Sequence, residues 1–245
     1  METMTERHRW TQPPRRHLTA QVDLRTGRPD PHASSGFSAA VLLGGTGAWL
    51  LAGLTDDVVE RAGTARLDPV VEGFAVAHRT YWLSAGMQVV TWLGSGVVLV
   101  PILLVATAFL LATRGAVRAA VEIWAAYLGG VALYTTIKAV IDRPRPPVAE
   151  LITQAGGAAY PSGHATQAIA TWGMLALVLT RTYPPRARAA TLVAASLIVL
   201  VVGVSRIYLG AHWLTDVLAG YALGGAWIAF LLAIRLAAQR SRPAK

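Results

Sequence analysis

The sequence predicts an all-α integral membrane protein, a bundle of six transmembrane helices. Three observations support this fold class. Only 14% of the 245 residues are charged, against about 25% in an ordinary soluble domain. Long apolar runs almost free of charge recur six times, and most of the cations lie in the connections on one side of them. A large soluble helical bundle is the alternative, and the recurrence of runs of this length argues against it.

The predicted spans follow from the length that a helix needs to cross a bilayer, about 20 mostly apolar residues. They are Phe37–Leu54, Ala85–Ala112, Ala116–Val140, Ser162–Thr180, Ala189–Tyr208 and Ala211–Ile234. The second contains Pro101, so we expect it to be kinked or shorter than written.

The remaining segments have a different composition. Residues 1–36 are polar and rich in Arg and Pro, which predicts a disordered tail ahead of a membrane domain at 37–235 and a basic tail at 236–245. No signal peptide is predicted, because the first apolar run begins only at residue 37. In the connection between the first two spans, Val70, Phe74, Ala77 and Tyr81 have helical spacing. They predict a short interfacial helix, with a plain solvated loop as the alternative.

The net charge of +9 is interpreted as an orientation signal. With six spans, 15 of the 22 cations lie in the two tails and in the second and fourth connections, all on one side. The positive-inside rule then places both termini in the cytoplasm of a plasma membrane and the third and fifth connections outside. Nucleic-acid binding is therefore not expected. The chain has no Cys, which excludes a disulfide framework, an iron–sulfur cluster and a thiolate zinc site.

Three clusters of ionisable residues lie at the outward ends of the predicted spans, where charge is costly unless it has a function. The first contains Lys138, Arg143 and Arg145, followed by prolines that end the helix. Cations at one depth repel each other unless an anion joins them, and Arg and Lys both suit phosphate. A basic helix end that reaches lipid headgroups is the alternative.

The second cluster, Ser162-Gly163-His164, begins the fourth span. Ser162 is a favourable N-cap, Gly163 allows close approach of a ligand, and the helix end attracts anions. His164 can carry a proton near neutral pH. An ordinary helix cap with an interfacial histidine is the alternative.

The third cluster contains Arg206, His212 and Asp216. His212 and Asp216 are four residues apart, so one is expected above the other on a helix face. An acidic partner on one imidazole nitrogen leaves the other free to act as a nucleophile. A helix-stabilising His–Asp pair beside a snorkelling arginine is the alternative. Taken together, the three clusters predict one anion-binding pocket with two histidines.

These motifs resemble a known family signature. Lys138-x6-Arg145-Pro146, Pro161-Ser162-Gly163-His164 and Ser205-Arg206-x5-His212-x3-Asp216 are similar, in order and spacing, to the three-part signature of the type 2 phosphatidic acid phosphatase (PAP2) superfamily. The resemblance spans residues 138–216. The spacing from Lys138 selects Arg145 as the arginine of that signature and leaves Arg143 an auxiliary role.

The resemblance implies a metal-independent lipid phosphatase with no cofactor. His212 would attack phosphorus to form a phosphohistidine, Asp216 would orient it, and His164 would act as acid and then base. The groups that would bind the phosphate oxygens are Lys138, Arg145, Ser162, Gly163 and Arg206. The sequence itself lacks a carboxylate cluster suited to Mg²⁺ at this site.

Substrate and partners are less well defined. A phosphate or pyrophosphate on a membrane lipid is expected, of isoprenoid, phosphatidylglycerol phosphate, phosphatidate or diacylglycerol pyrophosphate type, and no oligomeric state is predicted. Three rival functions remain: a lipid phosphotransferase on the same scaffold, an anion transporter with broken helices, and a haloperoxidase. The six apolar spans argue against the last, and the lack of an evident inverted repeat argues against the transporter.

Overall fold

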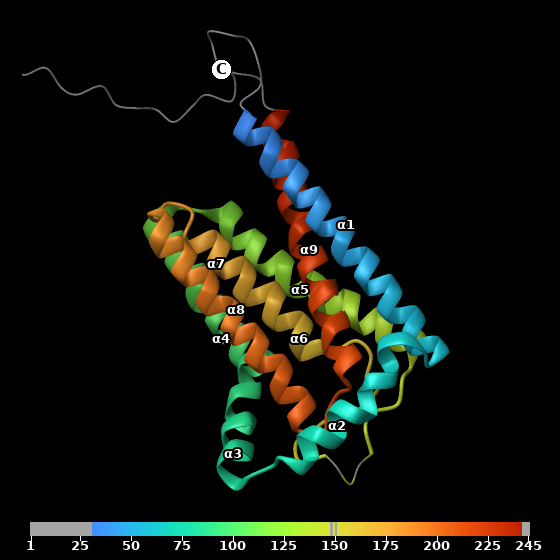
Figure 1. Cartoon of the computed structure of the whole chain (residues 1–245). Coiled ribbons are helices and arrows are strands. Elements are labelled where there is room, and N and C mark those ends of the chain that lie inside the picture. The colour runs from blue at the N-terminus through green and yellow to red at the C-terminus, as the bar shows by residue number, and fades with distance from the viewer. Residues whose placement is uncertain (1–30, 148, 150, 242–245) are drawn as a thin grey trace, which may run out of the picture.

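The computed structural model describes residues 31–147, 149 and 151–241, and within them it is helical with no strand (Figure 1). In these described ranges, five helices are long and apolar enough to cross a bilayer. They are α1 (Pro31–Glu60), α4 (Gly96–Arg114), α5 (Val117–Ile141), α8 (Pro185–Tyr208) and α9 (Leu214–Arg240). The predicted fourth span is a continuous helical path in three parts, α6 (Gly163–Ala168), the π-helical turn η4 (Ile169–Gly173) and α7 (Met174–Leu179). The predicted all-α membrane bundle is confirmed.

The first two spans have other limits than predicted. Helix α1 continues past Leu54 to Glu60, with the Thr55 hydroxyl bonded to the Leu51 carbonyl at 2.7 Å. The predicted second span is interrupted, because Ser95 is extended and its hydroxyl accepts from the Val97 amide at 3.3 Å as the N-cap of α4. The span therefore begins at Gly96, shorter than predicted, and keeps Pro101 inside the helix.

The connection between these spans is helical, so the plain-loop alternative is wrong. It contains the 3₁₀ helix η1 (Gly63–Leu67), α2 (Asp68–Ala77), α3 (Tyr81–Val90) and the 3₁₀ helix η2 (Thr91–Gly94). Val70 and Phe74 lie on α2 with exposed side chains, whereas Tyr81 begins the next helix. The predicted single helix is thus two, separated at His78–Thr80 because Thr80 caps α3.

The predicted tails are shorter where they can be described. Residues 31–36, assigned to the disordered tail, form the first turns of α1, and residues 236–240, assigned to the basic tail, complete α9. Apolar packing of α1 along α9 extends both helices beyond their apolar runs, since a Cβ on Gly36 would contact the Leu236 side chain at 3.8 Å. Residues 1–30 and 242–245 lie outside the described residues.

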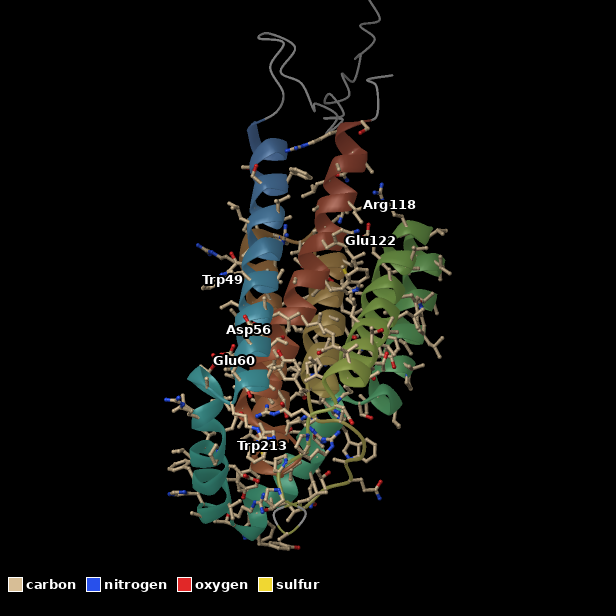
Figure 2. All side chains as sticks on the ribbon, turned by 90° about the vertical axis from the view of Figure 1, so that its right-hand side faces the viewer. Trp49, Asp56, Glu60, Arg118, Glu122 and Trp213 are labelled. Atoms are coloured by element: carbon tan, nitrogen blue, oxygen red, sulfur yellow. The ribbon has the colours of Figure 1, made fainter. Side chains whose placement is uncertain are left out.

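The bundle has two distinct ends (Figure 1). Helix α1 begins and α9 ends at one end, while α2, α3 and the start of α9 lie at the other. Figure 2 shows the same division, with Arg118 and Glu122 toward the first end and Glu60 and Trp213 toward the second. The described helices therefore follow the alternating path that six spans require.

Small residues let α6 approach α9 closely. A Cβ on Gly220 would lie 2.7 Å from the Ser162 carbonyl oxygen, and one on Gly224 would lie 2.8 Å from the Thr166 carbonyl oxygen. Such contacts are closer than real Cβ atoms allow, so glycine is required at both positions. The Ser162 amide also donates to the Asp216 carbonyl at 2.9 Å. This packing fixes the beginning of the fourth span against that of the sixth.

Candidate functional site

Three helix ends meet at the end of the bundle that holds α2 and α3. Helix α5 ends at Ile141, where Asp142 takes a left-handed conformation and the prolines that follow prevent further helix. Helix α6 begins after Ser162, and α8 turns into α9 through Gly210, whose φ is 71°. The three predicted motifs lie on these ends, so residues up to 78 positions apart are brought together.

A cavity of about 360 Å³ lies between the three ends. Six of the nine predicted site residues line it, namely Lys138, Arg145, Gly163, His164, Arg206 and His212. Its wall also includes Tyr127, Tyr134 and Gln167, which were not predicted. These side chains come from the inner faces of α5 and α6, and no charge marked them in the sequence. The predicted convergence of both histidines and the cations on one cavity is present in the structure.

His212 and Asp216 form the closest His–carboxylate pair of the site. The His212 Nδ1 lies 3.3 Å from Asp216 Oδ2, and both side chains are buried. The same carboxylate oxygen accepts from the Trp213 amide at 2.9 Å. The expected helix-face geometry is wrong in one respect, because α9 begins at Leu214 and His212 lies in the turn before it. Asp216 reaches back from the first turn of α9 to that turn.

His212 lines the cavity, and its other ring nitrogen, Nε2, lies beside Arg145. With Nδ1–H donated to Asp216, Nε2 carries the lone pair, and Arg145 Nη1 lies 3.3 Å from it. Burial lowers the pKa of His212 well below its usual value, and the charges of Arg206, Arg145 and Lys138 lower it further. The imidazole is therefore neutral at neutral pH, as a nucleophile requires.

Two of the three cations that line the cavity, Lys138 and Arg145, are held by backbone carbonyls. Lys138 Nζ donates to the Ala158 and Ala159 carbonyls at 2.5 and 3.1 Å. Arg145 donates to Gly156 and to Gly157, at 2.8 and 3.0 Å. These bonds also fix the course of the loop that leads to Ser162.

Arg206 is the most enclosed of the cations, with 3% of its surface exposed. Its Nη1 donates to Thr91 Oγ1 at 2.8 Å, and its buried Nε has no hydrogen-bond partner. Among the described residues, none of the three cations that line the cavity forms an ion pair with a carboxylate within 4 Å. A buried guanidinium with an open donor is costly unless an anion completes it. The cavity thus has positive charge and open donors for an oxyanion.

The other three predicted residues lie behind the cavity wall. Ser162 is buried, and its hydroxyl accepts from the Ala165 amide at 3.5 Å as the N-cap of α6. Arg143 donates to Asp216 Oδ1 and to Asp68 Oδ2, each at 2.6 Å. Neither Arg143 nor Asp216 lines the cavity; both support His212 from behind. A phosphate-binding role for the Ser162 hydroxyl stays a prediction.

No group of three or more His, Cys, Asp or Glu side chains suited to a metal ion occurs within residues 31–147, 149 and 151–241. The charged groups that face the cavity are cations. Such a donor set suits an anion and does not suit Mg²⁺.

Comparison with known proteins identifies the fold and the family. The PAP2 superfamily model matches residues 119–240. Phosphatidylglycerophosphatase B of Bacillus subtilis (strain 168) is 30% identical over 165 residues, 64% of this chain and 77% of that protein.

Two solved structures are similar. One is the transmembrane PAP2-type phosphatidylglycerolphosphate phosphatase from Bacillus subtilis, with a TM-score of 0.70 and 25% identity over 84% of this chain and 98% of that one. The other is LpxE of Aquifex aeolicus, with a TM-score of 0.55 and 24% identity over 68% and 94% of the two chains. With its apolar helices and its cation-lined cavity, the chain belongs to the PAP2 superfamily and is a membrane phosphatase.

Proposed function

We propose that the chain hydrolyses lipid phosphates or pyrophosphates at the outer face of the membrane, without a metal ion, through a phosphohistidine. The observation that carries the proposal is the cavity itself. It joins a neutral His212, a second histidine and three cations without carboxylate partners, which are the groups that an in-line displacement at phosphorus needs.

The first step is displacement on His212. The Nε2 lone pair attacks phosphorus, the bond from phosphorus to the lipid oxygen breaks, and His164 gives a proton to the leaving oxygen. Lys138, Arg145 and Arg206 stabilise the charge on the non-bridging oxygens. Asp216 stabilises the positive charge that the His212 ring acquires.

The second step returns the enzyme to its starting state. His164, now neutral, takes a proton from water, whose oxygen attacks phosphorus as the phosphorus–Nε2 bond breaks. Inorganic phosphate leaves, and both histidines regain their original protonation. A lipid hydroxyl in place of water would make the same intermediate a phosphotransferase, so the acceptor decides between the two activities.

A lipid substrate is supported by the position of a second cavity. An apolar cavity of about 640 Å³ lies between α4, α7 and α8, and its wall includes Pro101, Phe109 and Ile198. Gly96 of α4 lines the polar cavity and Pro101 the apolar one, five residues or about 7.5 Å apart along the helix. A phosphate bound at the three cations would therefore have space for an apolar chain nearby.

The sidedness of the site is part of the proposal. The cation count predicts that both termini are cytoplasmic, and α1 begins and α9 ends at the end of the bundle opposite the site. The names of the relatives from Bacillus subtilis support phosphatidylglycerol phosphate among the expected substrates.

The test is phosphate release by the purified full chain from a panel of lipid phosphates and pyrophosphates in EDTA, with and without an acceptor lipid. We expect long-chain lipid phosphates to be preferred over short soluble ones. His212→Ala should lose activity by several orders of magnitude while it remains folded, and wild-type protein quenched with acid-free denaturant should hold phosphate on His212. A strict Mg²⁺ requirement, or His212→Ala activity within a few-fold of wild type, would contradict the proposal.

A further inference from the structure

Asp68, at the first position of α2, is buried beneath the site. Only 2% of its surface is exposed. Its Oδ2 accepts from Arg143 Nη2 and from Thr215 Oγ1, both at 2.6 Å, and its Oδ1 accepts from the Thr215 amide at 2.9 Å. A carboxylate this deep is costly unless a charge partner compensates it. Asp68 therefore belongs with the ionic groups behind His212.

Arg143 lies between two carboxylates. Its Nη2 contacts Asp68, and its Nη1 donates to Asp216 Oδ1 at 2.6 Å and to Thr215 Oγ1 at 2.7 Å. The guanidinium carbon lies 5.6 Å from the centre of the Trp213 ring. Asp216 in turn contacts His212 through its other oxygen. An unbroken chain of charged groups thus runs from α2 to the proposed nucleophile.

The signs of these charges suggest the function of Asp68. Asp216 has to stabilise positive charge on His212, yet Arg143 contacts the same carboxylate and would cancel it. With Asp68 included, two negative charges face one positive charge, and the group as a whole remains an anion. Without Asp68 the Arg143–Asp216 pair would be neutral, and His212 would face it from within a ring of cations.

We propose that Asp68 is a positioning residue that neutralises Arg143 and so leaves Asp216 a net anion behind His212. The inference rests on the proposed function, in which His212 is the nucleophile. It assigns a role in the reaction to α2, a helix outside the three motifs that carry the chemistry. Asp68 does not line the cavity, so its effect is on the charge of His212 and not on contact with substrate.

The charge of His212 depends on all the ionisable groups around it. They come from α5, the loop after α5, α6, α8 and α9, and they are Lys138, Arg145, His164, Arg206 and Asp216. Four of these are cationic or can become so. Asp216 is the one anion among them. A change in the net charge of the group that contains Asp216, Arg143 and Asp68 is therefore expected to alter the protonation of His212.

The experiment measures kcat, KM and the acid limb of kcat/KM for Asp68→Asn in the full chain. We expect kcat to fall about tenfold, with KM unchanged, since one pKa unit of charge stabilisation is equivalent to that rate. Loss of the negative charge disfavours protonated His212, so the acid limb should move to lower pH. Glu60→Gln is the matched control: it removes an exposed negative charge at the same end of the bundle (Figure 2) and should not move the limb.

Two further variants separate charge from packing. Thr215→Val removes the hydroxyl shared by Asp68 and Arg143 without changing charge, so the limb should stay in place. In Asp68→Asn with Arg143→Gln, the two changes cancel, and the limb should return toward its wild-type position. The proposal would be overturned by a double variant whose acid limb is displaced as far as that of Asp68→Asn. It would also be overturned by an Asp68→Asn enzyme with the kcat and the acid limb of wild type.

Asp68→Glu keeps the charge and tests the same idea where the Asn variant is not recovered. The acid limb of its kcat/KM profile should match that of wild type, and a displaced limb would contradict the proposal that Asp68 acts through its charge. His212→Ala, assayed beside these variants, distinguishes the two levels of failure. If it hydrolyses substrate at the wild-type rate, the proposed function itself is wrong; if it is inactive while Asp68→Asn behaves as wild type, only the role of Asp68 is wrong.

Discussion

At the scale of single residues, burial and the cations around His212 both lower the pKa of its imidazole. Lys138→Met removes one of these cations and keeps much of the apolar stem. We expect kcat to fall roughly 10²-fold, as when one donor to a developing oxyanion is lost. With less positive charge nearby, protonated His212 is less disfavoured, so its pKa rises and the acid limb of kcat/KM moves to higher pH.

The pH profile of kcat/KM also contains the ionisation of the substrate, which is the same for every variant. Each acid limb is therefore compared with that of a control variant. Arg66→Gln removes an exposed positive charge from η1, outside the cavity, and should leave the limb where it is in wild type. The direction is opposite to that expected for Asp68→Asn. A limb that moves to lower pH in Lys138→Met would show that Lys138 does not act on the protonation of His212.

The site residues that the sequence predicted are the charged ones at the ends of spans, whereas their partners from distant parts of the chain were missed. Lys138, Arg145, His164, Arg206 and His212 could be predicted because charge near a membrane span has few structural explanations. Their partners could not. Asp68 and Thr91 contact the site across 75 and 115 positions of sequence, so only the fold shows that they hold Arg143 and Arg206.

At the scale of elements, the spans were predicted well and their ends less well. Apolar length identifies a span, but an end depends on caps and on packing against other helices. Ser95 interrupts the second span because its hydroxyl and extended backbone form an N-cap, a local effect within an apolar run. Helix α1 gains turns at both ends beyond its apolar run, and α9 gains two at its C-terminal end.

The contact of α6 with α9 should be sensitive to a single methyl group. In Gly220→Ala the new Cβ would lie 2.7 Å from the Ser162 carbonyl oxygen, so the helices must separate. We expect a loss of roughly 1–3 kcal/mol in the free energy of unfolding. Activity should fall as well, because His164 moves with α6 away from His212.

Thermal unfolding in detergent and phosphate release together test this contact. Gly225→Ala is the matched control, since its nearest atom to a new Cβ is 3.7 Å away, an ordinary contact. It should unfold near the wild-type temperature and keep its activity. Equal melting temperatures for the two variants would contradict the prediction, because they would show that the contact of α6 with α9 accommodates an added methyl group at residue 220.

At the scale of the whole molecule, the two ends of the bundle differ in kind. One end carries the cations of the second and fourth connections, where Glu122 of α5 contacts Arg181 and lies 3.5 Å from Arg118. The other carries the cavity and its supporting carboxylates. The cations that predict the orientation in the membrane thus lie at the opposite end of the bundle from the cations proposed to bind the substrate.

This separation predicts which end reacts with an impermeant reagent. The chain has no Cys, so single cysteines can be introduced into a clean background. Glu60→Cys lies at the end that holds the cavity, and Ser241→Cys lies just after α9 at the opposite end; both positions are exposed.

In intact spheroplasts, a membrane-impermeant maleimide should label Glu60→Cys fully and Ser241→Cys only after permeabilisation. The reverse pattern would place the cavity in the cytoplasm. Labelling of both in sealed cells would put the two positions on the same side, which contradicts the five spans that separate them, α4, α5, α6 to α7, α8 and α9. Phosphate release from substrate supplied outside the same spheroplasts should follow the labelling of Glu60→Cys, because one face of the bundle carries both.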